Sequence, residues 1–176
     1  MSFSNEQVTT EELPQYEEVT LEQLPKECMI VGMITWLIIL LISLTIITIL
    51  NFVQNMPLFK GGVLYWILAY VTALVLGCLF IRISYLRKGY AVREHDITYK
   101  SGIIWHKRIV LPFNRIQHVE THQGVLQRKF ELAKLQLFTA GGQRADMTID
   151  GLGFAVSESI KSSILNRLEN EHVDGY

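Results

Sequence analysis

The segment from His118 to His122 holds the residues best suited to chemistry, because two imidazoles flank the carboxylate of Glu120. On a helix, His residues four positions apart share a face and can bind one metal ion together. The surrounding residues instead alternate as in a strand, where each residue advances the chain by about 3.3 Å. The two imidazoles would then lie roughly 13 Å apart, too far for one ion. We therefore predict a solvated strand face and no metal site here.

Other combinations of residues typical of catalysis or cofactor binding are weak. Gly141-Gly142 is not followed by the Lys-Ser/Thr pair of a phosphate loop and is typical of a turn. The serine hydroxyls have no His and acid that the sequence places nearby. Cys28 and Cys78 are too far apart in the chain for a metal-ligand spacing and are expected to be free thiols. The sequence thus predicts no cofactor and no enzymatic activity.

Charge is segregated along the chain. Residues 1–28 hold seven Glu and one Lys, whereas residues 82–176 hold fourteen basic and ten acidic residues. This excess is too small and dispersed to indicate nucleic-acid binding, but basic residues near a bilayer are attracted to anionic headgroups by about 1 kcal/mol each. The residues expected to contact the membrane surface are Arg82, Arg87, Lys88, Arg93, Lys107 and Arg108.

Two uncharged runs determine how these residues are positioned. Met29–Leu50 makes a helix of roughly 33 Å and Val63–Ile81 one of about 28 Å, each long enough to span a bilayer. Two buried core helices would be the soluble alternative, but little else in the chain is large enough to cover them. We therefore predict a two-helix transmembrane hairpin over residues 29–81.

The orientation of the hairpin follows from the basic residues beside it. Arg82, Arg87 and Lys88 follow the second run closely, whereas the loop between the runs has only Lys60. Because basic residues favour the cytoplasmic side, both termini are expected in the cytoplasm of a cell whose plasma or inner membrane holds the hairpin. The acidic start of the chain does not match a cleavable secretion signal.

The N-terminal segment and a stripe of small residues in the second span each allow two interpretations. Residues 1–28 form either an acidic flexible tail or a docking segment that lays apolar side chains on a neighbouring surface, namely Leu13, Tyr16, Val19, Leu21 and Leu24. In the second span, Ala69, Ala73 and Gly77 form a stripe of small residues. The stripe packs either within the hairpin or against the helix of a partner.

Beyond a basic juxtamembrane segment (residues 82–88), residues 89–176 show short alternating strands and one final amphipathic helix from Phe154 to about Glu169. Ile103–Leu111 alternates, which predicts a strand with Trp105 and Leu111 on one face. Ile116 and Val119 have opposite parity, so burying both requires a bulge. The expected fold is α+β: an antiparallel bent sheet or open barrel of six or seven strands, capped by the helix.

The motifs that carry a family resemblance are Tyr90–Gly102, Leu111–Val119, Gln123–Phe130 and Leu137–Gly142. Through them the chain resembles the bacterial membrane-anchored pleckstrin-homology-like (PH-like) domain proteins, the YdbS-like family. One departure is Glu131, where that family usually has Gly after the Phe. The resemblance implies a non-enzymatic membrane-tethered module that assembles with a larger polytopic relative carrying similar domains, or with itself.

The sequence is compatible with two functions. The first is a cytoplasmic-facing interaction module that also contacts anionic lipid. The second is an accessory subunit of an envelope system that exports or transports a lipid or peptide. Neither predicted span contains an Asp, Glu, Lys, Arg or His, and transport pathways through a membrane usually need such residues. This absence favours the first function.

Overall fold

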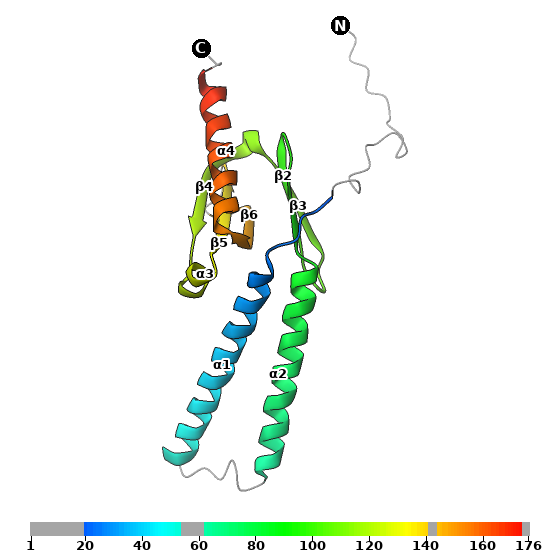
Figure 1. Ribbon diagram of the computed structural model, residues 1–176, viewed down its shortest axis with the longest axis vertical. Helices are drawn as coiled ribbons and strands as arrows, with labels where there is room; N and C mark the ends of the chain where they lie inside the picture. The colour runs from blue at the N-terminus through cyan, green and yellow to red at the C-terminus, as the bar shows by residue number, and fades with distance from the viewer. Residues whose placement is uncertain (1–19, 54–61, 141–143, 174–176) are drawn as a thin grey trace, which may run out of the picture.

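The protein consists of a helical hairpin and a small domain at one end of it (Figure 1). The computed structural model describes residues 20–53, 62–140 and 144–173. Helices α1 (Lys26–Val53) and α2 (Val63–Leu86) run side by side, and both are long and apolar enough to cross a membrane. The predicted hairpin is therefore confirmed. Helix α2 continues five residues beyond Ile81, so Arg82 lies on the helix and no flexible segment separates the hairpin from the domain.

Six antiparallel strands form two three-stranded sheets. The first contains β1 (Gly89–Val92), β2 (Asp96–Ser101) and β3 (Lys107–Pro112), and the second contains β4 (Ile116–His122), β5 (Leu132–Thr139) and β6 (Met147–Gly153). The short 3-10 helix η2 (Phe113–Arg115) joins the sheets, α3 (Val125–Lys129) joins β4 to β5, and α4 (Phe154–Val173) packs against the second sheet. This confirms the predicted α+β PH-like fold, with two sheets that do not close into a barrel.

The bulge predicted in the fourth strand is present. The pairing register of β4 with β5 shifts between Ile116 and His118, and this shift lets both Ile116 and Val119 point into the core. An added residue in one strand reverses the parity of the residues that follow it, which explains how two positions of opposite parity can both be buried.

The third strand is shorter than its alternation suggested. Strand β3 begins at Lys107, because Gly102 has a φ of +109° and turns the chain away from the sheet. A side chain at Gly102 would overlap the carbonyl oxygen of Trp105. Trp105 is 87 % exposed, whereas Leu111 is buried. The predicted strand over Ile103–Leu111 is therefore wrong at its start, and the residues from Ile103 to His106 form a loop.

The hairpin and the domain share one hydrophobic core. Leu24, which is only 2 % exposed, and Tyr85 of α2 belong to the same buried cluster as the strands, and the Tyr85 hydroxyl donates a 2.9 Å hydrogen bond to the Leu24 carbonyl. Glu22 forms an isolated bridge with Tyr90 at the free edge of β1, through two backbone hydrogen bonds of 2.8 and 3.0 Å. The docking interpretation therefore describes residues 21–25, while Leu13, Tyr16 and Val19 lie outside the described residues.

The turn that ends α3 explains the departure at Glu131. This residue has a φ of +52°, the only positive φ among the described residues other than glycine. Glycine adopts this left-handed conformation without strain, whereas a residue with a Cβ does so at a cost. The turn keeps its geometry because the Phe154 amide donates a 2.7 Å hydrogen bond to the Glu131 carbonyl. The fold therefore tolerates Glu131 at a position where the family pattern has Gly.

Candidate functional site: the hairpin-side surface

The basic residues that follow the second span gather where α2 meets the domain. Arg82 is exposed on the helix, and Arg87 caps its end. The Arg87 guanidinium donates to the Ile103 carbonyl at 3.3 Å and lies 2.7 Å from His106 Nε2. These contacts fix the loop between β2 and β3 beside the end of α2 (Figure 1).

The basic residues on the first sheet separate into two groups. Lys107 and Arg108 are exposed at the start of β3, next to the loop that Arg87 holds. Arg93 lies at the opposite end of the sheet, where it forms an ion pair of 3.0 Å with Asp96. Strand β1 runs away from the hairpin, so its far end carries Arg93 away from any membrane that the hairpin spans. Arg93 therefore lies at the other end of the sheet from Arg87, Lys107 and Arg108.

Three large apolar side chains are exposed at the end of the domain that faces the hairpin, and they were not identified as surface residues from the sequence. Ile104 and Trp105 are 79 % and 87 % exposed in the β2–β3 loop, and Val125 is 91 % exposed on α3, which lies near the domain end of α1 (Figure 1). Exposed Trp beside basic residues is typical of the membrane interface. We call this set the hairpin-side surface: Arg82, Arg87, Ile104, Trp105, Lys107, Arg108, Val125, Arg128 and Lys129. The signal that could have revealed the loop was Gly102 followed by two adjacent bulky apolar residues.

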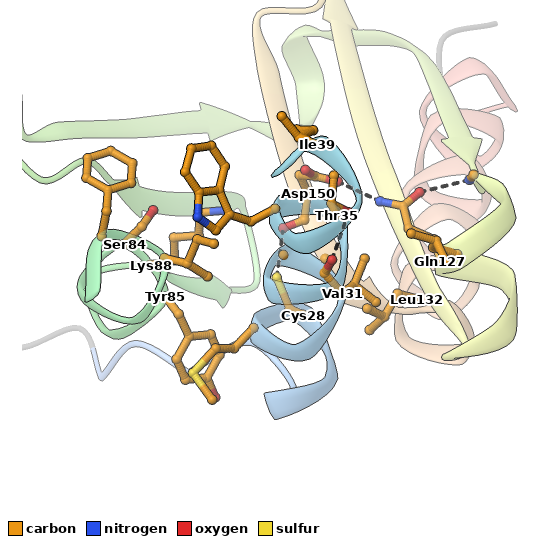
Figure 2. A pocket seen from close by; sticks show the side chains of 18 of the residues that line it. Cys28, Val31, Thr35, Ile39, Ser84, Tyr85, Lys88, Gln127, Leu132 and Asp150 are labelled. Carbon is orange, nitrogen blue, oxygen red and sulfur yellow. Dashed lines mark hydrogen bonds between the residues drawn. The ribbon is translucent and has the colours of Figure 1, made fainter. Parts of the chain in front are cut away.

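A cleft of about 630 Å³ lies between the hairpin and the underside of the domain. Figure 2 shows Ser84 and Lys88 on one side, Gln127 of α3 on the other, and Thr35 of α1 between them. Gln127 donates a 2.8 Å hydrogen bond to Asp150 on β6. Most of the lining is apolar and comes from the helices, so the cleft is an amphipathic hollow where helices and domain meet.

The stripe of small residues on α2 is only partly used in the contact with α1. Trp36 of α1 packs over Gly77, where an added Cβ would overlap its indole ring, and Trp36 Nε1 donates to the Ala73 carbonyl at 3.3 Å. Ala69 is exposed instead. Four-residue steps drift around a helix of 3.6 residues per turn, so three such positions do not stay on one contact face. In the structure Gly77 and Ala73 therefore pack within the hairpin.

The order of parts and the sequence both match one family. The model of the family described as "Bacterial PH domain" matches residues 18–168. The chain belongs to this family. It is 31 % identical over 96 residues to the UPF0699 transmembrane protein YdbS of Bacillus subtilis (strain 168), which is 53 % of this chain and 58 % of that protein. It is also 31 % identical over 110 residues to the UPF0699 transmembrane protein YdbT of the same organism, or 56 % of this chain and 22 % of that protein.

These matches place the bacterial PH domain protein in a membrane. Both relatives are named as transmembrane proteins, and the structure contains two helices that are long and apolar enough to span a membrane. The chain covers less than two thirds of the length of either relative. No solved structure matches the chain.

The His118 to His122 segment of this bacterial PH domain lies on β4, as expected, with both imidazoles on the face of Glu120. His118 Nε2 lies 3.0 Å from one Glu120 oxygen and His122 Nε2 lies 2.8 Å from the other. Both rings lean toward the carboxylate between them, so their Nε2 atoms are closer than the roughly 13 Å expected from strand spacing. Among the described residues, no group of three His, Cys, Asp or Glu has a geometry suited to a metal ion.

Hydrogen bonds from His122 and His118 lower the pKa of Glu120 below its ordinary value. Because the folded pKa is lowered, any stabilisation by the carboxylate is present above its ordinary pKa and is lost as the pH falls through the folded value. We expect His122→Ala to raise the pKa of Glu120 more than His118→Ala does, as measured by NMR titration of the carboxyl carbon. The pKa of Asp146, which hydrogen bonds from Thr139 lower, should not move in either variant. An unchanged pKa of Glu120 in His122→Ala would contradict this assignment.

Proposed function

We propose that the protein is a non-catalytic, membrane-anchored PH-like module that faces the cytoplasm and acts in protein–protein assembly, with its hairpin-side surface resting on anionic headgroups. The observation that carries the proposal is the rigid connection between hairpin and domain. Only Arg87 and Lys88 separate α2 from β1, and Leu24 and Tyr85 join both parts in one core. A domain held this close to a membrane helix cannot leave the bilayer surface.

The chemistry of the large cleft supports a non-catalytic role. The residues that line it include one thiol, Cys28, but no His that could act as its base. The Cys28 thiol lies 3.9 Å from the backbone carbonyl of Asp150, which is no base either. Without an imidazole beside it, the Cys28 thiol lacks the arrangement that is typical of cysteine catalysis.

A longer relative of the same domain type is the partner that we propose. The two relatives come from one organism, and similar matched lengths make up 58 % of one and 22 % of the other, so the second is the longer protein. Purification in mild detergent followed by mass spectrometry should recover such a protein with this chain. Recovery of an ATPase or carrier instead would favour the alternative, an accessory subunit of an export or transport system.

The proposed orientation predicts which segments are accessible from outside the cell. Arg82, Arg87 and Lys88 flank α2 on the domain side, whereas only Lys60 lies between the spans. With Cys28 and Cys78 replaced, a cysteine at Asn55 should react with an impermeant thiol reagent in intact cells. A cysteine at Asp174 should react only after the cells are opened. Labelling of Asp174 in intact cells would reverse the orientation.

A further inference from the structure

A second hollow of about 310 Å³ lies beside the domain end of α2. Arg87 and Lys88 line it from the end of the hairpin, Lys100 from β2, and His106 from the β2–β3 loop. Gln23 lines it from the segment that docks on β1. The hollow is therefore built from four separate parts of the chain, and we call it the basic pocket.

The strand register brings the basic side chains together. Lys100 pairs directly with Gly89 in the first sheet, which places it beside Lys88, and Arg87 contacts His106 at 2.7 Å. Because a guanidinium can only donate, His106 Nε2 accepts in this contact. Arg87 and Lys100 thus line a hollow of about 310 Å³, and Lys88 lies between this hollow and the first cleft, because it lines both.

The basic pocket has no carboxylate among its described lining residues. Glu22, the nearest acidic residue in the docked segment, makes a hydrogen bond with the Tyr90 side chain and does not line the pocket. Like charges at this spacing repel one another, and a bound anion would remove the repulsion. Converging Lys and Arg side chains are the groups that proteins use to bind phosphate.

We propose that the basic pocket binds the phosphate group of an anionic phospholipid from the surrounding leaflet. Arg87 lies six residues beyond Ile81, the last residue of the uncharged run, or about 9 Å along the helix. Because the headgroup layer is about 5–7 Å thick on each side, the Arg87 backbone lies just outside it, and its long side chain can reach back to a phosphate. Leu86, which is exposed at the mouth of the pocket, would contact the apolar part of the same lipid.

The inference rests on the proposed placement of the hairpin in the bilayer and adds a site for one lipid. Diffuse attraction to a charged surface depends on the number of basic residues, whereas a pocket depends on which residues are changed. Lys100 and Arg115 allow this distinction, because each carries one positive charge but only Lys100 lines the pocket, whereas Arg115 is exposed on η2. Replacing either by Gln removes one positive charge.

The test is native mass spectrometry of the full-length protein, purified in detergent and titrated with phosphatidylglycerol or phosphatidylcholine. The wild type should retain one phosphatidylglycerol in preference to phosphatidylcholine. Lys100→Gln and Lys88→Gln should each weaken retention about tenfold, because each removes a charge-assisted contact. Arg115→Gln should leave it unchanged, and thermal unfolding of each variant should show that it remains folded.

Three outcomes would overturn the proposal. Equal losses in Lys100→Gln and Arg115→Gln would show that only the total charge matters. No preference between the two lipids would show that the pocket does not select an anionic headgroup. In the third outcome, the lipid-free protein retains inorganic phosphate, loses it in Lys100→Gln and shows no preference between the two lipids. That result would assign the pocket to a soluble phosphate. Protein that alkaline carbonate extracts from cell membranes would instead show that the hairpin does not span, a failure of the proposed function itself.

Discussion

Replacement of Leu24 by Ala is expected to lower the free energy of unfolding by about 2–5 kcal/mol, the usual range for a buried Leu. Leu24 is 2 % exposed and packs in the core that the strands share with Tyr85. The smaller side chain leaves a cavity under the docked segment and weakens the bridge from Glu22 to the edge of β1. Denaturant unfolding of the full-length protein in detergent, followed by far-ultraviolet circular dichroism, measures the change.

Leu21 provides the matched control for this variant. It lies in the same segment, three residues earlier, but it is only half-buried. Leu21→Ala should cost clearly less than Leu24→Ala, because less apolar surface returns to water on unfolding. Equal and small effects of both changes would mean that residues 20–25 do not pack into the core, and the shared core of hairpin and domain would be wrong.

Replacement of Gly77 by Leu is expected to force α1 and α2 apart. The new side chain would occupy the position of the Trp36 indole, and overpacking of this kind typically costs 1–3 kcal/mol. Ala73→Leu should act in the same direction, because Trp36 bonds to the Ala73 carbonyl. A Cβ at Gly32 of α1 would lie 3.1 Å from the Ile81 side chain of α2, so cysteines at these two positions can form a disulfide and report the separation.

With Cys28 and Cys78 replaced, oxidative crosslinking of the two introduced cysteines should fall several-fold in Gly77→Leu. Ala69→Leu is the control, because Ala69 lies on the same helix but is exposed. Its crosslinking yield should equal that of the parent protein. A fall in Ala69→Leu as large as in Gly77→Leu would show that the crosslink responds to bulk anywhere on α2 and not to the contact with Trp36.

The sequence predicts which helices and strands form better than it predicts where each one begins and ends. Length and lack of charge are sufficient to identify α1 and α2, and the opposite parity of Ile116 and Val119 was enough to require a bulge. The loop around Trp105 could not be separated from β3 in this way, because its residues continue the alternation of the strand. The distinction depends on Gly102, whose positive φ is a property of the folded turn.

Contacts between distant parts of the chain account for the other differences. Leu24 and Tyr85 are sixty-one positions apart, so no local pattern shows that they complete the core of a domain predicted to begin at Gly89. Arg93 has the same charge and neighbourhood in the sequence as Arg87 and Lys88. Only the direction of β1 shows that it lies at the far end of the sheet beside Asp96.

If the hairpin-side surface rests on the bilayer, Trp105 lies at the depth of the lipid headgroups, and measuring this depth is the most direct test. Full-length protein with Trp36 and Trp66 replaced by Phe retains Trp105 as its one fluorophore of this type. In vesicles with anionic lipid, spin labels attached near the headgroup should quench Trp105 strongly, and aqueous iodide should quench it weakly. Strong quenching by iodide with none by the lipid labels would place the β2–β3 loop in water and contradict the account.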